Sequence, residues 1–294
     1  MKQKFLILGG DLRSIRLAQM LAEDENKVFS YAQEKSDEIL DSTEIEKCTT
    51  LKGAISKAQI IVAPIPFSSN NESINTPFSD EKIMIEDLLK VNKNKIFIGG
   101  SINEEIRTKL NDKYLDVIDV MKREELAILN TIATAEGTIE VAIKNTDTIL
   151  QGSRVLILGF GRVAKIVASK FRSLSAIVTC AARKISDLAW IKAYGYHSLD
   201  INDMLYDLKD FDIIINTVPQ TIIKEKELKH MNSNVLLVDL ASAPGGIDSK
   251  MATNMGLKFV WALALPGKIA PTSSAKFIKE TIYNVIEEKS KKVE

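Results

Sequence analysis

An apolar, strand-like run that passes through a glycine turn into an amphipathic helix is the feature that most constrains this chain. Residues 155–158 read Val-Leu-Ile-Leu, and Gly-Phe-Gly-Arg-Val-Ala follows at 159–164. In such a turn Gly159 permits the tight reversal, Gly161 lets the backbone approach phosphates, and Ala164 lets helix and strand pack closely. The helix N-terminus offers unpaired N–H groups and a positive dipole end to an anion. Because a strand precedes the glycines and a helix follows them, the sequence predicts a dinucleotide-binding fold rather than an ordinary turn.

The next predicted strand, residues 176–180, ends in Ala181-Ala182-Arg183-Lys184. Folds that bind NAD usually carry an acidic residue there, about 20 residues past the glycines, to bond the ribose 2′-OH. Two small residues followed by two cations suit a 2′-phosphate instead, since a guanidinium can pair bidentately with phosphate oxygens. We therefore predict NADP as the cofactor, with Arg183 as the main contact and Lys184 as a looser one. A basic, solvated turn is the alternative.

Composition sets the outer limits. The 294 residues are enough for two domains of ordinary size, and 39 basic residues balance 39 acidic ones, which gives no electrostatic reason to expect nucleic acid or a membrane surface as a partner. The apolar runs are strand-sized, well below the roughly 20 residues of a membrane span, and residues 1–4 do not resemble a signal peptide. Two isolated cysteines, Cys48 and Cys180, give no metal-ligand spacing and suit a reducing cytoplasm.

Strands and helices alternate along the chain, which favours an α/β fold of two doubly wound parallel-sheet, Rossmann-like domains with a cleft between them. We expect a substrate domain at 1–122, a linking helix at 123–147, an NADP-binding domain at 148–268, and a C-terminal helix at 269–294 that packs back on the first domain. The expected strands are 5–8, 27–31, 60–63, 95–100 and 117–119, then 155–158, 176–180, 213–216, 235–239 and 258–261. His197 and His230 fall in predicted connections, where surface histidines are expected.

Further candidates for cofactor binding follow the later strands. Asn216-Thr217-Val218-Pro219 ends the strand nearest the expected nicotinamide ribose, where a small polar residue and a fixed turn fit. Asp239 ends a buried strand and either orients the site or accepts hydrogen bonds from local backbone N–H groups, as a buried carboxylate must. The full set of candidate cofactor contacts is Gly159, Gly161, Arg162, Val163, Arg183, Lys184, Thr217, Val218, Pro219, Asp239, Ala241, Leu265 and Pro266.

Candidate substrate contacts lie in other loops at predicted strand ends. Arg13, at a helix start after Gly9-Gly10, either holds a substrate carboxylate or is a surface residue beside a turn. Ser68 lies in a proline-stiffened loop. The start of the last helix, with Thr272 and Ser273, either cradles an anion or is simply N-capped. The predicted substrate set is Arg13, Ser68, Lys268, Thr272 and Ser273; Glu136 is the weak first choice for a base, and no metal site is expected.

With these loops assembled, the chain resembles the A subunit of dipicolinate synthase nearly from end to end. The resemblance rests on Gly9-Gly10-Asp11-x-Arg13, on residues 123–130 and 134–137, on the glycine turn at 158–163, and on two long motifs, Asp239-Leu-Ala-Ser-x-Pro-Gly-Gly246 and Leu265-Pro-Gly-Lys-x-Ala-Pro271. After Pro271 the family has Lys-Thr-Ala-Gly where this chain has Thr-Ser-Ser-Ala, so a lysine contact is lost there. Lys268 is a candidate to compensate.

The resemblance implies NADP-dependent oxidation of dihydrodipicolinate, derived from hydroxytetrahydrodipicolinate, to dipicolinate. It also implies that a flavoprotein B subunit is the partner, that a small dicarboxylate is the substrate, and that the protein works in the cytoplasm of a sporulating bacterium; a homo-oligomer is expected as well. Two alternatives remain open. The first is another two-domain NADP dehydrogenase that acts on a 2-hydroxy or amino acid, although neither histidine is placed for that chemistry. The second is a non-catalytic NADP-sensing module.

Overall fold

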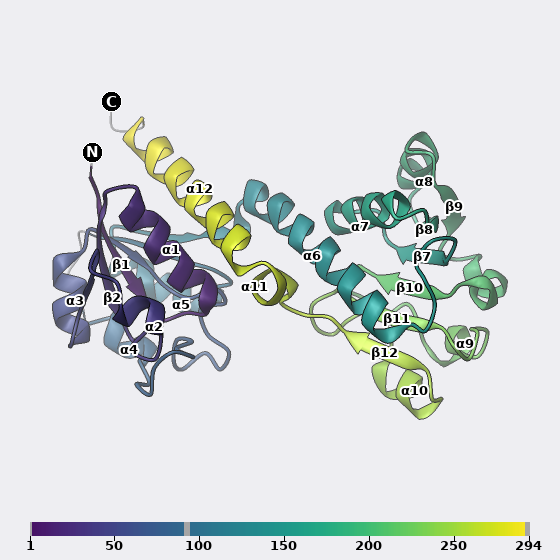
Figure 1. The fold of residues 1–294 in the computed structure, drawn as a ribbon, viewed down its shortest axis with the longest axis horizontal. Coiled ribbons are helices and arrows are strands. Elements are labelled where there is room, and N and C mark those ends of the chain that lie inside the picture. The colour runs from purple at the N-terminus through teal and green to yellow at the C-terminus, as the bar shows by residue number, and fades with distance from the viewer. Residues whose placement is uncertain (1, 91–94, 292–294) are drawn as a thin grey trace. The chain divides into compact units, whose positions relative to one another are not determined.

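The computed structural model describes residues 2–90 and 95–291, and these form two compact units (Figure 1). Unit 1 comprises residues 1–130 and 270–294, and unit 2 comprises residues 131–269. Each unit contains one six-stranded parallel sheet. The doubly wound α/β fold predicted from the alternating pattern is therefore confirmed. The predicted interdomain cleft stays a prediction, and Met1 and the tail at 292–294 lie outside the described residues.

Unit 1 has the strand order β3-β2-β1-β4-β5-β6. Its strands are β1 (Lys4–Leu8), β2 (Lys27–Tyr31), β3 (Ile45–Lys47), β4 (Ile60–Val62), β5 (Ile96–Gly99) and β6 (Asp116–Asp119). Its helices are α1 (Leu12–Glu23), α2 (Asp37–Leu40), α3 (Leu51–Lys57), α4 (Ile85–Leu88), α5 (Glu104–Asn111), the short 3-10 turn η1 (Val120–Lys122), and α12 (Pro271–Ser290). The long helix α12 packs along α1, so the end of the chain completes this unit (Figure 1).

Unit 2 repeats the same order as β12-β11-β10-β7-β8-β9. Its strands are β7 (Arg154–Leu158), β8 (Ile177–Ala182), β9 (His197–Asp200), β10 (Ile213–Asn216), β11 (Leu236–Asp239) and β12 (Lys258–Trp261). Helices α7 (Arg162–Ser173), α8 (Ile185–Ala193), η2 (Met204–Asp210), α9 (Glu225–Leu228), α10 (Ser249–Asn254) and α11 (Leu265–Ile269) connect or follow them. Helix α6 (Glu124–Asn145) begins in unit 1 and continues into unit 2.

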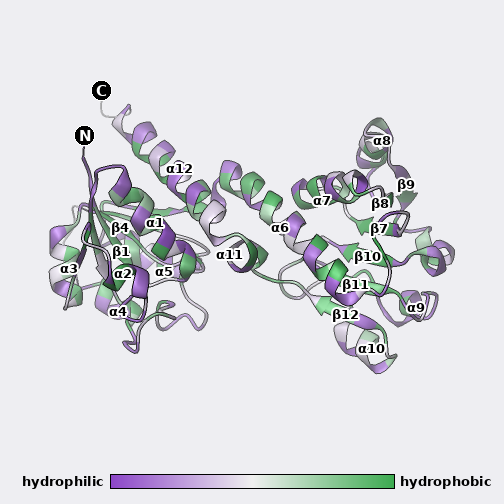
Figure 2. Cartoon of the chain, viewed as in Figure 1, coloured by the Kyte–Doolittle hydropathy of each residue, from purple (hydrophilic) through white to green (hydrophobic). Residues whose placement is uncertain are grey.

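The central strands of both sheets are apolar on both faces, as expected where helices cover a parallel sheet (Figure 2). In β1 the residues from Phe5 to Leu8 are buried, and in β7 those from Val155 to Leu158 are buried. Phe171 of α7 and Leu21 of α1 are fully buried against these sheets. At roughly 25 cal/mol per Å² of apolar surface, this burial is the main stabilising contribution to each unit.

Three local predictions were wrong. The short edge strand β3 was not predicted, and its Ile45-Glu-Lys sequence has too few residues to show alternation. His197 begins the edge strand β9 instead of lying in a connection, although it is exposed as expected. Residues 265–269 form helix α11 instead of a loop.

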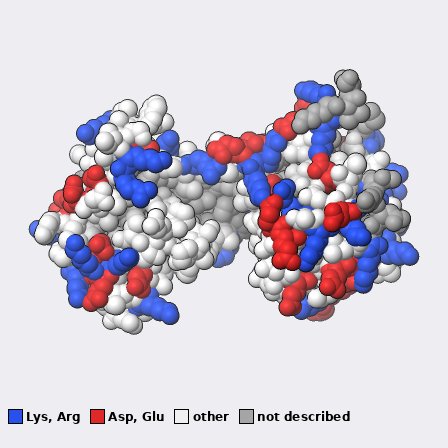
Figure 3. All heavy atoms as spheres, turned by 180° about the vertical axis from the view of Figure 1, so that it is seen from behind, with Lys and Arg blue, Asp and Glu red and all other residues white. Residues whose placement is uncertain are grey.

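Helix α6 is long and apolar enough to cross a membrane by length and composition alone, contrary to the expectation of strand-sized apolar runs only. Core helices of soluble proteins share this length and composition. In α6, 39% of the most apolar 18-residue stretch is buried, and Leu126 of the same helix is fully buried. Acidic and basic side chains are interspersed on the face shown in Figure 3, which agrees with the balanced composition.

Candidate functional site

The glycine turn after β7 has the backbone that a close approach to phosphate requires. Gly159 has φ +95°, a conformation that favours glycine, and a Cβ there would lie 2.7 Å from Thr217 Oγ1. Gly161 is the N-cap of α7 and has no side-chain hydrogen bond to the helix start; a Cβ there would meet nothing within 4 Å. Ala164 is fully buried between helix and sheet. Gly161 therefore leaves room for an anion at the N-terminus of α7.

A hollow of about 250 Å³ opens beside this turn, at the carboxyl ends of β7 and β8. It brings together four of the predicted cofactor contacts, namely Gly159, Arg183, Lys184 and Val218. Seven other residues line it that were not among the predicted cofactor contacts: Phe160, Ala182, Asp187, Ile201, Asn202, Gln220 and Ile222. Ile201 and Asn202 after β9, and Gln220 and Ile222 beyond the predicted turn after β10, carry no local motif, so only the strand order places them here.

The two cations of this hollow lie directly after β8, which ends at Ala182. Arg183 and Lys184 are both exposed, and within the described part of the chain no ion pair engages either of them. Among the residues that line the hollow, the acidic one is Asp187, in the first turn of α8. Two cations against one carboxylate leave a positive excess, which suits an anionic group on the ligand.

Asp239 and Asn216 form a buried network at the carboxyl ends of β11 and β10. The Asp239 carboxylate is 1% exposed and accepts hydrogen bonds from Asn216 Nδ2 (2.7 Å) and from the backbone N–H groups of Ala241 (3.0 Å), Gly246 (2.7 Å) and Ile247 (3.1 Å). Asn216 also makes two hydrogen bonds to the backbone of Val218: its Nδ2 donates to the carbonyl, and its Oδ1 accepts from the N–H. Asp239 therefore holds local backbone, and its oxygens are already satisfied.

The remaining predicted cofactor contacts have different environments. Thr217 packs over the turn, and its Oγ1 donates to Leu158 O (2.8 Å). Ala241 is buried, and its carbonyl accepts from Trp261 Nε1 (2.9 Å). Leu265 is buried against Gly137, where a Cβ would lie 3.1 Å from it. The others are placed as follows: Arg162 and Val163 open α7, Pro219 follows Val218, and Pro266 is in α11.

The corresponding turn of unit 1 is closed by its own chain. Gly10 N–H donates to Asn75 O (2.9 Å), and a Cβ on Gly9 would lie 2.8 Å from Thr76 Cγ2. Asp11 caps α1 by accepting from Arg13 N (3.0 Å). A second nucleotide does not fit this arrangement, which agrees with the missing third small position in the sequence.

Arg13 is not free to bind a substrate carboxylate in the way the sequence suggested. Its Nε and Nη2 donate to both oxygens of Asp11 (2.7–3.1 Å), and Nη2 also donates to Ile65 O. The side chain is 11% exposed, so the guanidinium is fixed by these partners. Arg13 holds the turn and the following loop together.

Ser68 is likewise used within its loop. Its Oγ donates to Ser73 O (2.6 Å) and accepts from the N–H of Asn71 (2.9 Å). Beside this loop, Asp11 and residues 64–66 and 75–77 line a hollow of about 430 Å³ that Ser68 does not reach. Unit 1 thus contains a cavity at the expected strand ends; residues 64–66 of the predicted loop line it, whereas Ser68 and Arg13 do not.

The start of α12 differs from one of the two readings of the sequence, and the other, an anion cradle, stays a prediction. Its N-cap is Ala270, without a side-chain cap, so the simple N-capping alternative was wrong. Thr272 and Ser273 are both exposed, and Lys268 is exposed at the end of α11. Nothing in unit 1 brings Thr272 or Ser273 into the hollow beside Asp11.

The chain contains few groups suited to acid–base or nucleophilic chemistry at these sites. Glu136, the weak candidate base, is half-exposed and paired with Lys170 (2.9 Å). His230 is half-buried, and its Nδ1 contacts Lys226 O (2.9 Å). Burial raises the pKa of the Cys180 thiol to about 12, so it stays protonated. Among residues 2–90 and 95–291, no cluster of three potential metal ligands occurs.

Both units match known proteins. Residues 4–121 match the model of the N-terminal domain of the dipicolinate synthase A subunit. Residues 110–249 match the NAD-binding domain of D-isomer specific 2-hydroxyacid dehydrogenases. The A subunit of dipicolinate synthase from Bacillus subtilis is 29% identical over 287 residues, which cover 97% of this chain and 96% of that protein.

Two crystal structures have the same fold as this chain over almost their whole length. The A subunit of dipicolinate synthase from Bacillus halodurans has a TM-score of 0.87 at 29% identity, and the match covers 96% of this chain and 97% of that one. The same subunit from Bacillus subtilis has a TM-score of 0.87 at 28% identity, and the match covers 98% and 97%. The predicted resemblance is confirmed: this chain is a homologue of the A subunit of dipicolinate synthase, and it is an oxidoreductase with a nicotinamide-cofactor domain.

Proposed function

We propose that this chain is the A subunit of a dipicolinate synthase, and that it oxidises dihydrodipicolinate, formed from hydroxytetrahydrodipicolinate, to dipicolinate with NADP. The observation that carries the proposal is the similarity to the Bacillus subtilis protein, which extends along 97% of the chain and includes both units. The match to the NAD-binding domain of 2-hydroxyacid dehydrogenases covers residues 110–249.

The residues of unit 2 fit a dinucleotide. The open N-terminus of α7 binds the pyrophosphate, because its N–H groups have no side-chain cap and Gly161 leaves room for the ligand. Arg183 pairs with the 2′-phosphate of NADP, and Lys184 adds a second positive charge. The nicotinamide accepts the hydride, and the protein contributes binding and orientation.

The reaction suits a site with few acid–base groups. Loss of a hydride and a proton makes the substrate ring aromatic, so positioning supplies most of the rate enhancement. Glu136 remains the candidate base, and its carboxylate is paired with Lys170 at 2.9 Å.

The relatives are named as one subunit of a synthase, which implies a second one. We propose that a flavoprotein B subunit is this partner, and that the protein works in the cytoplasm of a sporulating bacterium. The balanced surface charge gives no support to nucleic acid as a partner. A homo-oligomer remains part of the proposal.

The test combines the purified chain, NADP and enzymatically made hydroxytetrahydrodipicolinate, with and without the flavoprotein, and follows the absorbance of dipicolinate and NADPH. We expect both products to appear together. Arg183→Gln should raise the NADP concentration needed, whereas Glu105→Gln, on the exposed face of α5, should not. Absence of dipicolinate under both conditions, with NADP bound, would refute the proposal; NADPH formation from a 2-hydroxy acid would favour the alternative dehydrogenase.

A further inference from the structure

The glycine turn of unit 2 carries a single side chain between its two glycines. Gly159 and Gly161 flank Phe160, and Gly159 has φ +95°. Glycine restrains the backbone less than any other residue, so the shape of this turn has to be set by other contacts. Phe160 provides such contacts, because it is 6% exposed and packs into the core of unit 2.

Two tyrosines form the surface against which Phe160 packs. The Phe160 ring meets the rings of Tyr194 and Tyr196 edge-on, with centroid distances of 5.9 and 6.4 Å. The two tyrosine rings lie nearly parallel, with an interplanar angle of 15° and centroids 6.4 Å apart. Edge-to-face and offset-stacked rings at such distances attract one another. We refer to Tyr194 and Tyr196 as the tyrosine pair.

The tyrosine pair is fixed in turn by the far end of helix α7. Arg172, in the last turn of α7, donates from Nη1 to Tyr194 O (2.7 Å), and its guanidinium lies 5.3 Å from the centroid of the Tyr196 ring. Gly195, between the two tyrosines, has φ +75°, and a Cβ there would lie 3.3 Å from Arg172 Nη1. The pair therefore connects the turn at the start of α7 with the end of the same helix.

We propose that Tyr194 and Tyr196 are positioning residues for the dinucleotide: through Phe160 they hold the glycine turn in the shape that accepts the pyrophosphate. This inference rests on the proposed function, because it takes the pyrophosphate to bind at the N-terminus of α7. A turn that already has its bound shape loses less conformational entropy when the ligand binds. Neither tyrosine is among the residues that line the hollow beside the turn, so both act on affinity through Phe160.

The test compares two ligands of the full chain by calorimetric titration, directly for NADP and by displacement of NADP for adenosine 2′-monophosphate. NADP contains the pyrophosphate, whereas adenosine 2′-monophosphate contains only the part that we place beside Arg183. Tyr196→Leu should weaken NADP about tenfold, the effect of losing one or two ring pairs. It should leave the affinity for adenosine 2′-monophosphate nearly unchanged, a difference that a general loss of structure in unit 2 would not produce.

Three further variants make the test specific, and a thermal melt of each checks that the fold is kept. Tyr196→Phe retains the ring and should retain the wild-type NADP affinity. Tyr194→Leu, at a position that is 50% exposed, should reproduce the effect of Tyr196→Leu even where the latter does not fold. Tyr206→Leu is the matched control: it removes an exposed tyrosine whose ring meets His230 instead of Phe160, and it should change neither affinity.

A double-mutant cycle tests whether the tyrosines act through Phe160. Phe160→Leu should weaken NADP as well, and adding Tyr196→Leu to it should cost little more, because both changes remove the same contact. Unchanged NADP affinity in the tyrosine-to-leucine variants, equal losses for the two ligands, or additive losses in the cycle would overturn the inference.

These outcomes are separable from failure of the proposed function. Dipicolinate formation by a chain whose NADP affinity does not respond to the tyrosine variants keeps the function and removes this inference. Selective weakening of NADP in a chain that forms no dipicolinate does the reverse.

Discussion

The two units have the same strand order, yet their first turns differ in what the chain has placed there. Asp11 and Gly161 are both N-caps of the helix after the first strand, with φ/ψ of −85/−168° and −81/−166°. In unit 1 the cap is a carboxylate, and residues 75 and 76 cover the preceding glycines. In unit 2 the cap has no side chain and faces open space. The same strand order therefore does not by itself create a nucleotide site. The residue at the N-terminus of the following helix determines whether a phosphate can bind there.

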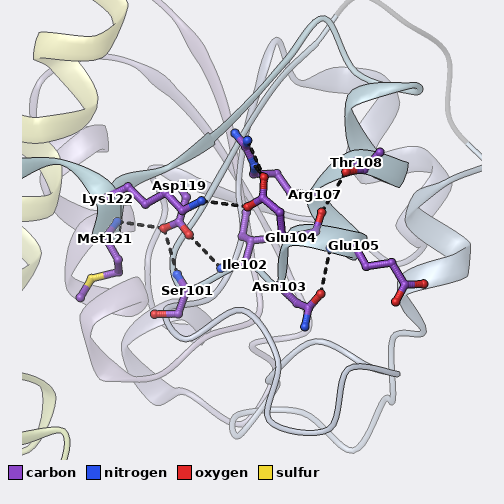
Figure 4. A network of polar contacts seen from close by, with 10 residues as sticks. All are labelled: Ser101, Ile102, Asn103, Glu104, Glu105, Arg107, Thr108, Asp119, Met121 and Lys122. Carbon is purple, nitrogen blue, oxygen red and sulfur yellow. Dashed lines mark hydrogen bonds and ion pairs between the residues drawn. The ribbon is translucent and has the colours of Figure 1, made fainter. Parts of the chain in front are cut away.

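A second point of comparison is the buried carboxylate at a strand end. Asp119, at the end of β6 of unit 1, is 7% exposed and accepts from the N–H groups of Ser101, Ile102 and Met121 at 2.9–3.0 Å (Figure 4). Asp239 of unit 2 is 1% exposed and has four donors, one of them the Asn216 side chain. Both carboxylates anchor a loop, and the unit 2 anchor is the more deeply buried.

This difference gives the largest expected effect. Asp239→Ala should cost about 4 kcal/mol of unfolding free energy, because it leaves four buried donors without an acceptor, and Asp119→Ala about 2 kcal/mol. Urea unfolding of each variant measures both values. Equal costs would contradict the ranking, and Glu105→Gln serves as a surface control with little change.

Exchanging the helix cap should convert one turn into the other. In Gly161→Asp the new side chain has room, and the backbone there has nearly the same φ/ψ as at Asp11, so the variant should stabilise α7 by about 0.5–1 kcal/mol. It should also weaken NADP binding about 100-fold, because the new carboxylate repels the pyrophosphate. Calorimetric titration and thermal melts measure the two opposite effects. Gly161→Ala is the neutral control, and NADP binding unchanged by the aspartate would place the pyrophosphate elsewhere.

The cation pair after β8 should decide between cofactors. Arg183→Gln should weaken NADP about tenfold or more and leave NAD nearly unchanged, since only NADP carries the 2′-phosphate. Lys184→Gln should have the smaller effect, and Asp187→Asn should strengthen NADP slightly by removing the opposing charge. Equal loss for both dinucleotides in Arg183→Gln contradicts the assignment.

The smallest effect concerns Glu104, beside the Asp119 network (Figure 4). Hydrogen bonds from Arg107 and Lys122 lower the pKa of Glu104 to about 2. Its contribution to stability is therefore present above the ordinary carboxyl pKa near 4.5 and is lost as pH falls toward 2. A carboxyl NMR titration should show the low value and its return toward normal in Arg107→Gln. Because the Glu104 carboxylate is exposed, the melting temperature should hardly change.

The sequence predicted most of the strands and the glycine turn, because a long apolar strand followed by a helix is a strong local signal. It missed β3 and β9, which are short edge strands without a full alternating pattern. It also missed what occupies each site. Arg13 is bound by Asp11 and by the carbonyl of Ile65. Asn202 and Gln220 line the same hollow as Arg183. These arrangements bring together segments that are distant in the sequence, and no local pattern encodes them.

The most direct test of the difference between the units is the number of NADP molecules bound per chain. Titration calorimetry on the wild-type chain should give one site, and the same experiment on Gly161→Asp should give none in the same concentration range. Two sites per wild-type chain, or one site that persists in Gly161→Asp, would contradict the account that unit 2 alone has an open turn.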